Sequence, residues 1–161
     1  MTHLDRALNE LRPPCARRFA RDERGTALLE AALTVPLVLL ISIGIFEFGR
    51  AYQTWQVLTN AAREGARVSV LPNPASGAVE ARVRAYLQSG QLPGYSSATV
   101  TVDRSATLQV GGATVTASQV TVDYPFTFIA LLPVARLVDE NATAGGAITI
   151  RASAVMRNEV Q

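Results

Sequence analysis

The chain has 161 residues, a formal net charge of +2 and a single cysteine, and 48% of its residues are hydrophobic. All fifteen basic residues are arginines. Residues 1–25 contain six arginines and four acids, whereas the remainder contains nine of each and has no net charge. The length suits one domain. Because the tail alone carries the basic excess, a nucleic-acid surface is not expected in the rest of the chain. A single cysteine excludes an intrachain disulfide.

A long apolar stretch follows the N-terminal tail. Residues 31–46 carry no charge, and the run reaches 24 residues, 26–49, if Glu30 and Glu47 are included. As a helix the longer run would measure about 36 Å, enough to cross a hydrocarbon core of about 30 Å. We therefore predict a single membrane-spanning segment over residues 26–49.

Charge on the two sides of this segment predicts its orientation. More arginines precede it than follow it closely, which favours a cytoplasmic N terminus. The predicted organisation is a cytoplasmic leader at 1–25, the span at 26–49 and an extracytoplasmic module at 50–161. A conventional cleaved signal peptide is the alternative, but only Ser42-Ile43-Gly44 approaches the small-residue cleavage pattern that it needs.

Glu30 and Pro36 lie inside the apolar stretch. A charge in a membrane-length helix costs on the order of 3 kcal/mol on insertion scales, which makes Glu30 a candidate functional residue. The alternative is that Glu30 lies close enough to the helix end to reach polar headgroups. Pro36 removes one backbone hydrogen bond and predicts a bend, either a device for subunit packing or an ordinary membrane-helix kink.

Helical periodicity continues past the apolar stretch to about Ser69. Tyr52 and Trp55 suit the aromatic belt of a membrane interface, or alternatively the core of the module. Beyond them, small side chains alternate with charged ones, and we expect the small face to pack against a sheet or another helix while the charges stay solvated. This segment consists of Asn60, Ala61, Ala62, Arg63, Glu64, Gly65, Ala66 and Arg67.

The rest of the chain predicts a short helix and a small antiparallel sheet of three to four strands. Proline and glycine between 72 and 77 break the first helix, and a second is predicted at 78–88. Period-two alternation then predicts strands at 98–102, 108–110, 113–124 and 147–156, with Gly111-Gly112 as a hairpin turn and Pro125 as a strand end. The fold class is therefore α+β.

Two apolar or acidic connections follow the third of these strands. Residues 126–133 are too hydrophobic for a free loop, and we favour packing on the sheet over contact with membrane or a partner. The second connection contains three consecutive polar residues, Asp139, Glu140 and Asn141. Because they lack the alternating ligand spacing of a calcium loop, we predict a solvated turn.

Residues for catalysis are missing from the module. The only histidine is His3, in the leader, so no histidine-based triad or metal site is available, and phosphate-loop and dinucleotide fingerprints are absent. We expect no enzyme, no metal and no cofactor.

Several motifs together resemble one family. Gly25 followed by an apolar helix with Glu30 five residues on is similar to the class III leader of type IV pilins. More specifically, the chain resembles the TadE-like pseudopilins of tight-adherence (Flp) pilus systems in the 60–67 segment above and in Leu33-Thr34-Val35-Pro36-Leu37, Phe46-Glu47-Phe48-Gly49-Arg50-Ala51, Val122-Asp123-Tyr124-Pro125-Phe126 and Ile148-Thr149-Ile150-Arg151-Ala152-Ser153-Ala154.

The resemblance implies a processed structural subunit. A prepilin peptidase would cut after Gly25, making Thr26 the mature N terminus and Glu30 the fifth residue of the mature chain. Ala31 stands where Flp-type prepilins usually have tyrosine, which points to a minor pseudopilin rather than the major pilin. The implied partners are the membrane, the peptidase, other pilins and the Tad assembly machinery. The resemblance also implies that the membrane is the bacterial inner membrane.

Two other functions stay open. A signal-anchored extracytoplasmic binding or sensing domain would keep residues 1–25 attached, and Glu30 would then be incidental. An anchored hydrolase would need a cluster of acids that only the folded module could assemble. We expect the minor-pilin function that the resemblance implies. The N terminus of the mature chain discriminates it from the sensing domain.

Overall fold

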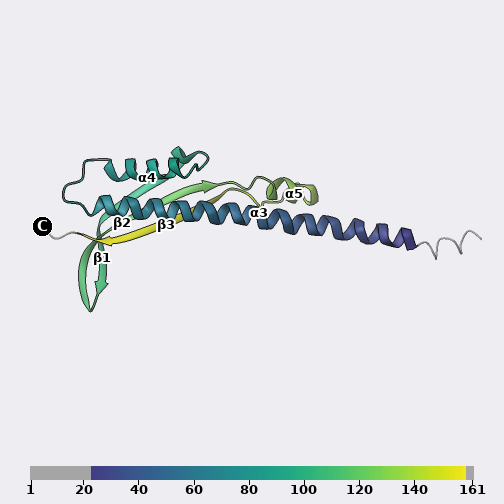
Figure 1. Ribbon diagram of the computed structural model, residues 1–161, viewed down its shortest axis with the longest axis horizontal. Coiled ribbons are helices and arrows are strands. Elements are labelled where there is room, and N and C mark those ends of the chain that lie inside the picture. Colours follow the sequence, from purple (N-terminus) through teal and green to yellow (C-terminus); the bar gives the residue numbers. More distant parts are fainter. Residues whose placement is uncertain (1–22, 159–161) are drawn as a thin grey trace, which may run out of the picture. The chain divides into compact units, whose positions relative to one another are not determined.

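The computed structural model describes residues 23–158 of the chain and contains four helices, one of them a single 3-10 turn, and three strands in that range. In chain order these are α3 (Glu23–Ser69), α4 (Ala78–Ser89), the 3-10 turn η1 (Tyr95–Ser97), β1 (Thr99–Val110), β2 (Ala113–Phe126), α5 (Leu131–Val138) and β3 (Ile148–Arg157) (Figure 1). The predicted leader lies outside these residues except for 23–25. The predicted fold class, a long apolar helix with a short helix and an antiparallel sheet, is confirmed.

The chain divides into two compact units, Met1–Ser42 and Ile43–Gln161, and α3 contributes to both. In the described part of the first unit the side chains of residues 25–42 are all exposed. Over Gly25–Ser69 the helix contains an 18-residue window of mean hydropathy 2.3 with no buried residue, so it is long and apolar enough to cross a membrane. None of the described residues 25–42 covers this apolar surface.

The second unit is built on an antiparallel sheet with strand order β1-β2-β3. β2 is the central strand and pairs with β1 from Asp123 to Ala113 and with β3 from Phe126 to Ala117. Side chains of β2 alternate between buried and less buried positions from Ser118 to Phe126, because successive residues of a strand point to opposite faces. One face of the sheet therefore forms the core, and the other faces solvent.

Two helices cover the core face. The last turns of α3 run antiparallel to α4, with Gly65 close to Val79 and Val83 and with Gly90 close to Val57 (Figure 1). Burying each Val or Leu of this layer contributes about 1.5–3 kcal/mol. The core consists of Leu58, Ala61, Ala62, Ala66, Val79, Val83, Leu87, Leu92, Ala98, Val120, Val122, Tyr124, Phe126 and Ala152.

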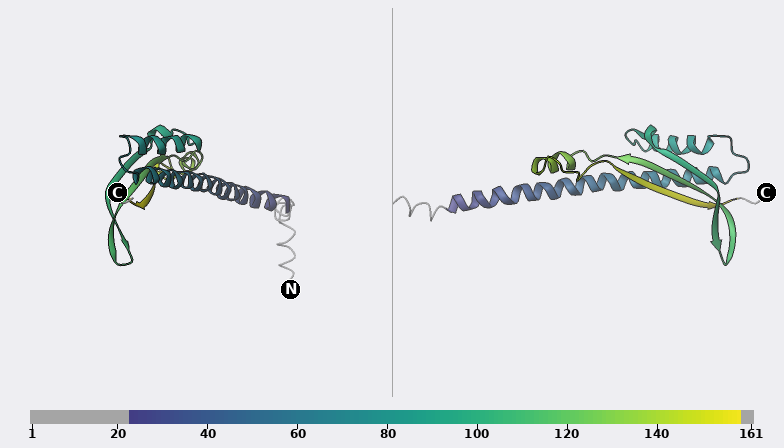
Figure 2. Two further views of the ribbon diagram at one scale, coloured as in Figure 1. Left: turned by 60° about the vertical axis from the view of Figure 1, so that its left-hand side comes forward. Right: turned by 180° about the vertical axis from the view of Figure 1, so that it is seen from behind.

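The β1–β2 hairpin corrects the prediction of two separate strands before the glycine turn. One strand, β1, runs through both predicted segments, and its register with β2 shifts between Asp103 and Ala106. At this bulge the amide and hydroxyl of Ser105 donate to the Asp103 carboxylate, over 2.9 and 2.6 Å. Beyond it the hairpin turns away from the helices (Figure 2), which is the usual effect of a bulge on strand direction.

Pro125 does not end β2, contrary to prediction. It is paired with Thr149 of β3, whereas the pairing with β1 stops at Asp123. Because only one strand flanks β2 at this point, the missing N–H of proline is tolerated as it is on an edge strand.

The apolar connection after β2 contains a helix that the sequence did not predict. α5 takes up residues 131–138, with Pro133 in its first turn, where the proline ring and missing N–H do not disturb the helix. The predicted packing on the core is correct for Phe126, which is buried, and wrong for Ile129, which is 64% exposed.

Candidate functional site

Glu47 is the one charged side chain of the core among the described residues, and it is fully buried. One carboxylate oxygen, Oε1, accepts hydrogen bonds from the backbone amides of Ile129 and Ala130 over 2.7 and 2.5 Å. The other, Oε2, accepts one from Arg50 Nη1 over 2.6 Å. The buried charge is therefore both paired and hydrogen-bonded, the condition under which burial of a carboxylate is tolerated.

The two amides bound by Glu47 lie at the start of α5. Ala130 is the N-cap residue of this helix, and its own side chain cannot cap. The first amides of a helix have no intrahelical partner, and the helix dipole favours a negative charge beside them. Glu47 thus caps α5 from a different helix. Gly145 supports the same turn, since a Cβ there would lie 2.6 Å from the backbone nitrogen of Leu132, and its φ of +80° suits glycine.

Arg50 joins the same cluster to the end of β2. Its guanidinium lies 5.2 Å from the ring centre of Phe126, which in turn packs edge-on against Phe128 at 5.2 Å. Phe128 also meets Phe48 of α3 edge-on, at 6.4 Å between ring centres. We call Glu47, Arg50, Phe126, Phe128 and the amides of residues 129 and 130 the Glu47 clamp. It connects α3, β2 and α5.

The Glu47 clamp was missed by sequence reasoning. Glu47 and Arg50 are three residues apart, a spacing at which helical side chains meet, and this was the available signal. The partner amides are 82 and 83 residues away along the chain, and no local pattern connects them with Glu47.

The small residues of the 60–67 segment line the contact with α4 and the sheet, as their size predicted. Ala61, Ala62 and Ala66 are fully buried. A Cβ placed on Gly65 would lie 2.6 Å from Cγ2 of Val83 and 3.1 Å from Cγ1 of Val120. Position 65 is therefore the point of closest approach between α3, α4 and β2.

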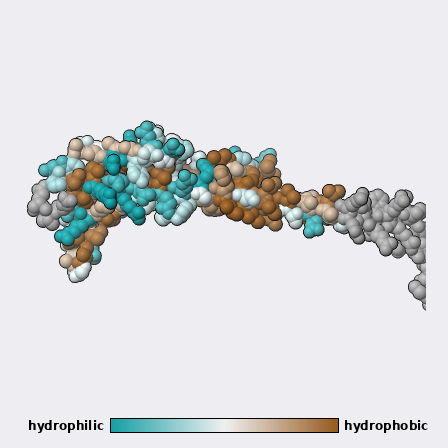
Figure 3. Space-filling model, in the orientation of Figure 1, coloured by the Kyte–Doolittle hydropathy of each residue, from teal (hydrophilic) through white to brown (hydrophobic). Residues whose placement is uncertain are grey.

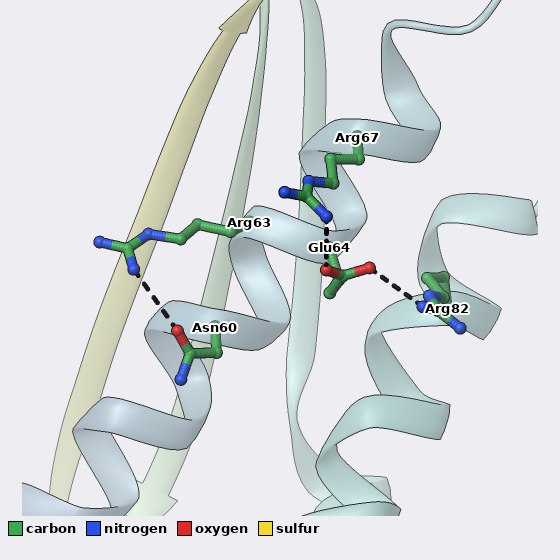
Figure 4. Close-up of polar contacts among 5 residues, drawn as sticks. All are labelled: Asn60, Arg63, Glu64, Arg67 and Arg82. Carbon is green, nitrogen blue, oxygen red and sulfur yellow. Dashed lines mark hydrogen bonds and ion pairs between the residues drawn. The ribbon is translucent and has the colours of Figure 1, made fainter.

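The charged residues of the segment lie on its outer side (Figure 4). Glu64 accepts from Arg67 over 3.3 Å and from Arg82 of α4 over 3.0 Å. Arg63 donates to Asn60 over 3.4 Å on the side away from α4 (Figure 4). Such exposed contacts stabilise a fold only weakly, and the Glu64–Arg82 pair is the one that links the two helices.

The two C-terminal motifs of the family resemblance meet in the sheet. Asp123 of β2 is the register partner of Arg151 of β3, and its carboxylate accepts from Nε and Nη2 over 2.6 and 2.9 Å. Hydrogen bonding to Arg151 holds the pKa of Asp123 below its ordinary value. Next to it, the buried hydroxyl of Tyr124 donates to the carbonyl of Pro93, and burial raises the pKa of this phenol.

The predicted processing and assembly residues all lie on α3 in the first unit. Gly25, Thr26 and Glu30 are exposed, and a Cβ on Gly25 would meet no atom within 4 Å. The backbone carbonyl of Glu30 accepts from the Thr34 hydroxyl over 2.9 Å. Pro36 is inside the helix. The roles assigned to these residues stay predictions.

Tyr52 and Trp55 are exposed by 61% and 42%, and their rings lie 5.9 Å apart. The alternative that places them in the core of the module is therefore wrong for this chain. Within residues 23–158 no three His, Cys, Asp or Glu side chains come together in a group that could hold a metal ion.

Comparison with protein families matches residues 25–67 to the model described as "TadE-like protein". The matched range covers the apolar stretch, Glu47, Arg50 and the whole 60–67 segment. Comparison with curated proteins and with solved structures gives no match. The match covers residues 25–67 of the 161 and is to the TadE-like family, which is the family that the sequence motifs predicted.

Proposed function

We propose that this protein is a minor pilin, a structural subunit that acts in the biogenesis of a tight-adherence (Flp) pilus. The observation that carries the proposal is the TadE-like match, which begins at Gly25 and includes Glu30 in an exposed apolar helix.

The N-terminal unit would act through processing and assembly. Cleavage after Gly25 by a prepilin peptidase gives Thr26 a free α-amino group, which is positive at neutral pH. In a low dielectric an unpaired carboxylate at Glu30 is costly, and an amino group from its own or a neighbouring subunit offsets much of that cost. The pair would set the register of neighbouring subunits in the membrane.

The C-terminal unit would be extracytoplasmic, anchored by a single span with the N terminus in the cytoplasm. The arginine excess before the apolar stretch supports this orientation. Its role in the proposal is to present a folded surface to other pilins and to the assembly machinery, without catalysis.

The mature N terminus tests the proposal. Intact-mass and N-terminal peptide analysis of the protein purified from host membranes should show a chain that begins at Thr26. Gly25→Val should retain residues 1–25 without disturbing the fold, because no atom lies within 4 Å of a Cβ there. Gly49→Ala, at an equally open position of the same helix, is the control and should be processed normally. An uncleaved chain beginning at Met1 would support a signal-anchored binding or sensing domain instead.

A further inference from the structure

Five large apolar side chains of the second unit are exposed near the Glu47 clamp. They come from residues 45–48 of α3, from the segment before α5 and from α5 itself, and each is between 62% and 86% exposed. We call this set the interfacial collar: Ile45, Phe46, Phe48, Ile129 and Leu137. Apolar surface of this kind gathers over α5 and the neighbouring turns of α3 (Figure 3).

We propose that the interfacial collar lies in the lipid of the membrane surface, with α5 as a short helix in the boundary between headgroups and acyl chains. The inference rests on the membrane anchor of the proposed function. It adds a second contact with the bilayer, made by a segment more than 80 residues further along the chain.

The Glu47 clamp fixes the position of α5 along α3. Because the Glu47 carboxylate binds the first amides of α5, the helix has to start beside the last turn of the uncharged run. At the end of the apolar run, a peptide segment beside α3 lies in the headgroup region of the membrane and not in bulk water. α5 has eight residues, about 12 Å of helix, which is far too short to cross the bilayer but fits a helix lying at its surface.

The distribution of the collar around α3 favours lipid over a protein partner. Successive residues of a helix are about 100° apart, so Phe46 lies about 100° from Ile45 in one direction and Phe48 about 60° from it in the other. Together the three side chains span about 160° of the helix surface. A docked protein covers one stripe of a helix, whereas lipid surrounds it. The collar is also continuous along the chain with residues 31–46, which carry no charge and are exposed up to Ser42.

The polar groups nearby are consistent with this depth. Glu47 is neutralised by Arg50 and by the α5 amides, so it does not present a free charge to lipid. Arg136 is the only charged residue of α5 and is exposed, so its guanidinium can extend to headgroups along its apolar stem. Tyr52 and Trp55, exposed on the next turns of α3, have side chains that favour the headgroup region.

Tryptophan quenching in vesicles tests the proposal on the full chain. Trp55 is the only tryptophan, so a Trp55→Phe background carries one reporter at a time. The reporters are Leu137→Trp and Ile129→Trp in the collar, Val38→Trp in the anchor, and Val110→Trp at the hairpin tip, where the side chain is 48% exposed. Each is reconstituted in phosphatidylcholine and phosphatidylglycerol vesicles that contain lipids brominated either near the headgroup or near the chain end.

The expected pattern separates the collar from the anchor. Both collar reporters should lose most of their fluorescence to bromine near the headgroup and less to bromine near the chain end. Val38→Trp should respond more to the deeper bromine, and Val110→Trp to neither. This pattern would support interfacial insertion of α5.

Three other outcomes would overturn the inference. Quenching of Val38→Trp without quenching of the collar reporters would show that α5 lies outside the lipid. The membrane anchor of the proposed function would still be supported. Blue-shifted but unquenched collar reporters would show that a neighbouring protein covers them. Absence of quenching at Val38→Trp would contradict the anchor itself and, with it, the collar.

Discussion

Gly65 of α3 faces Val83 of α4 so closely that no side chain fits between the two helices at this point. Only 2.6 Å would separate a Cβ at position 65 from the Val83 methyl carbon Cγ2. The spacing of the two helices, and therefore their packing against β2, depends on a residue without a side chain.

Replacing Gly65 by alanine should therefore destabilise the protein. Alanine gains about 1 kcal/mol of helix propensity over glycine, but overpacking a well-packed core costs typically about 1–3 kcal/mol. We expect a net loss of about 1 kcal/mol, seen as a lower midpoint of thermal unfolding of the detergent-solubilised chain. In the double variant with Val83→Ala the loss should be smaller than the sum of the two single losses.

Gly49→Ala is the matched control for this experiment. It makes the same change in the same helix where nothing lies within 4 Å, so it should leave the midpoint unchanged or raise it. A Gly65→Ala variant as stable as the Gly49→Ala variant would contradict the close approach.

Removing the Glu47 carboxylate should release the start of α5. Glu47→Ala leaves the part-buried amides of Ile129 and Ala130 without their carboxylate acceptor, at a cost of at most about 1–3 kcal/mol for each group. Hydrogen exchange followed by mass spectrometry should show faster exchange in peptides that cover residues 126–138. Glu47→Gln keeps one carbonyl oxygen as acceptor and should have a smaller effect.

Peptides from β3 serve as the internal reference for this measurement, since no β3 residue bonds to Glu47 among the described contacts. Unchanged exchange at residues 126–138 in Glu47→Ala would show that the clamp does not hold α5. Equal acceleration in β3 would show general unfolding instead.

The Asp123–Arg151 pair predicts a specific pH dependence. Hydrogen bonding to Arg151 lowers the pKa of Asp123 in the folded chain, so the pair contributes stability above the ordinary aspartate pKa of about 3.9. That contribution is lost as the pH falls below this value through the lower folded pKa. Asp123→Asn should lower the unfolding midpoint by about 2–4 °C at pH 7 and have progressively less effect below about pH 4.

Comparing wild type with Asp123→Asn at each pH cancels the contributions of the other acidic groups to the pH dependence of stability. Asp103, whose pKa is also lowered, by hydrogen bonds from Ser105, is present in both. A difference between wild type and Asp123→Asn that stays constant down to low pH would mean that the ion pair is not its cause.

Glu30 is expected to act in assembly and not in folding. Glu30→Ala removes a carboxylate from an exposed position of an apolar helix, so membrane insertion should be intact while cleavage or incorporation into pili is impaired. Pili counted by electron microscopy and membrane fractionation measure the two effects. Glu80→Ala, which removes one carboxylate from α4, is the control. Normal piliation in Glu30→Ala would contradict the assembly role.

Local signals in the sequence predicted α3 and α4 well. α3 ends at Ser69 as predicted, just before Pro72 and Pro74, and α4 extends one residue past its predicted end. Gly90 follows α4 directly, and a Cβ there would lie 2.7 Å from a methyl group of Val57.

The errors occurred where tertiary contacts outweigh local preference. Pairing with β2 carries β1 through Asp103 and Ser105, polar residues that break its alternation. Pairing with β3 carries β2 past Pro125. α5 forms in a segment with a proline because Glu47, far away in the sequence, satisfies its first amides. No window of the sequence contains both partners of that contact.

The distance along the chain between Glu47 and Ile129 also bears on how the second unit folds. The sequence separation of 82 residues includes α4, the hairpin and most of the sheet, so a single carboxylate closes the entire loop. Closing such a loop before its contents fold would cost entropy that few contacts have yet offset. α5 should therefore dock last, after the sheet has brought the end of β2 to α3. Because closure entropy rises by only about 0.6 kcal/mol per doubling of loop length, the hairpin can also lengthen or shorten with little effect on the closure.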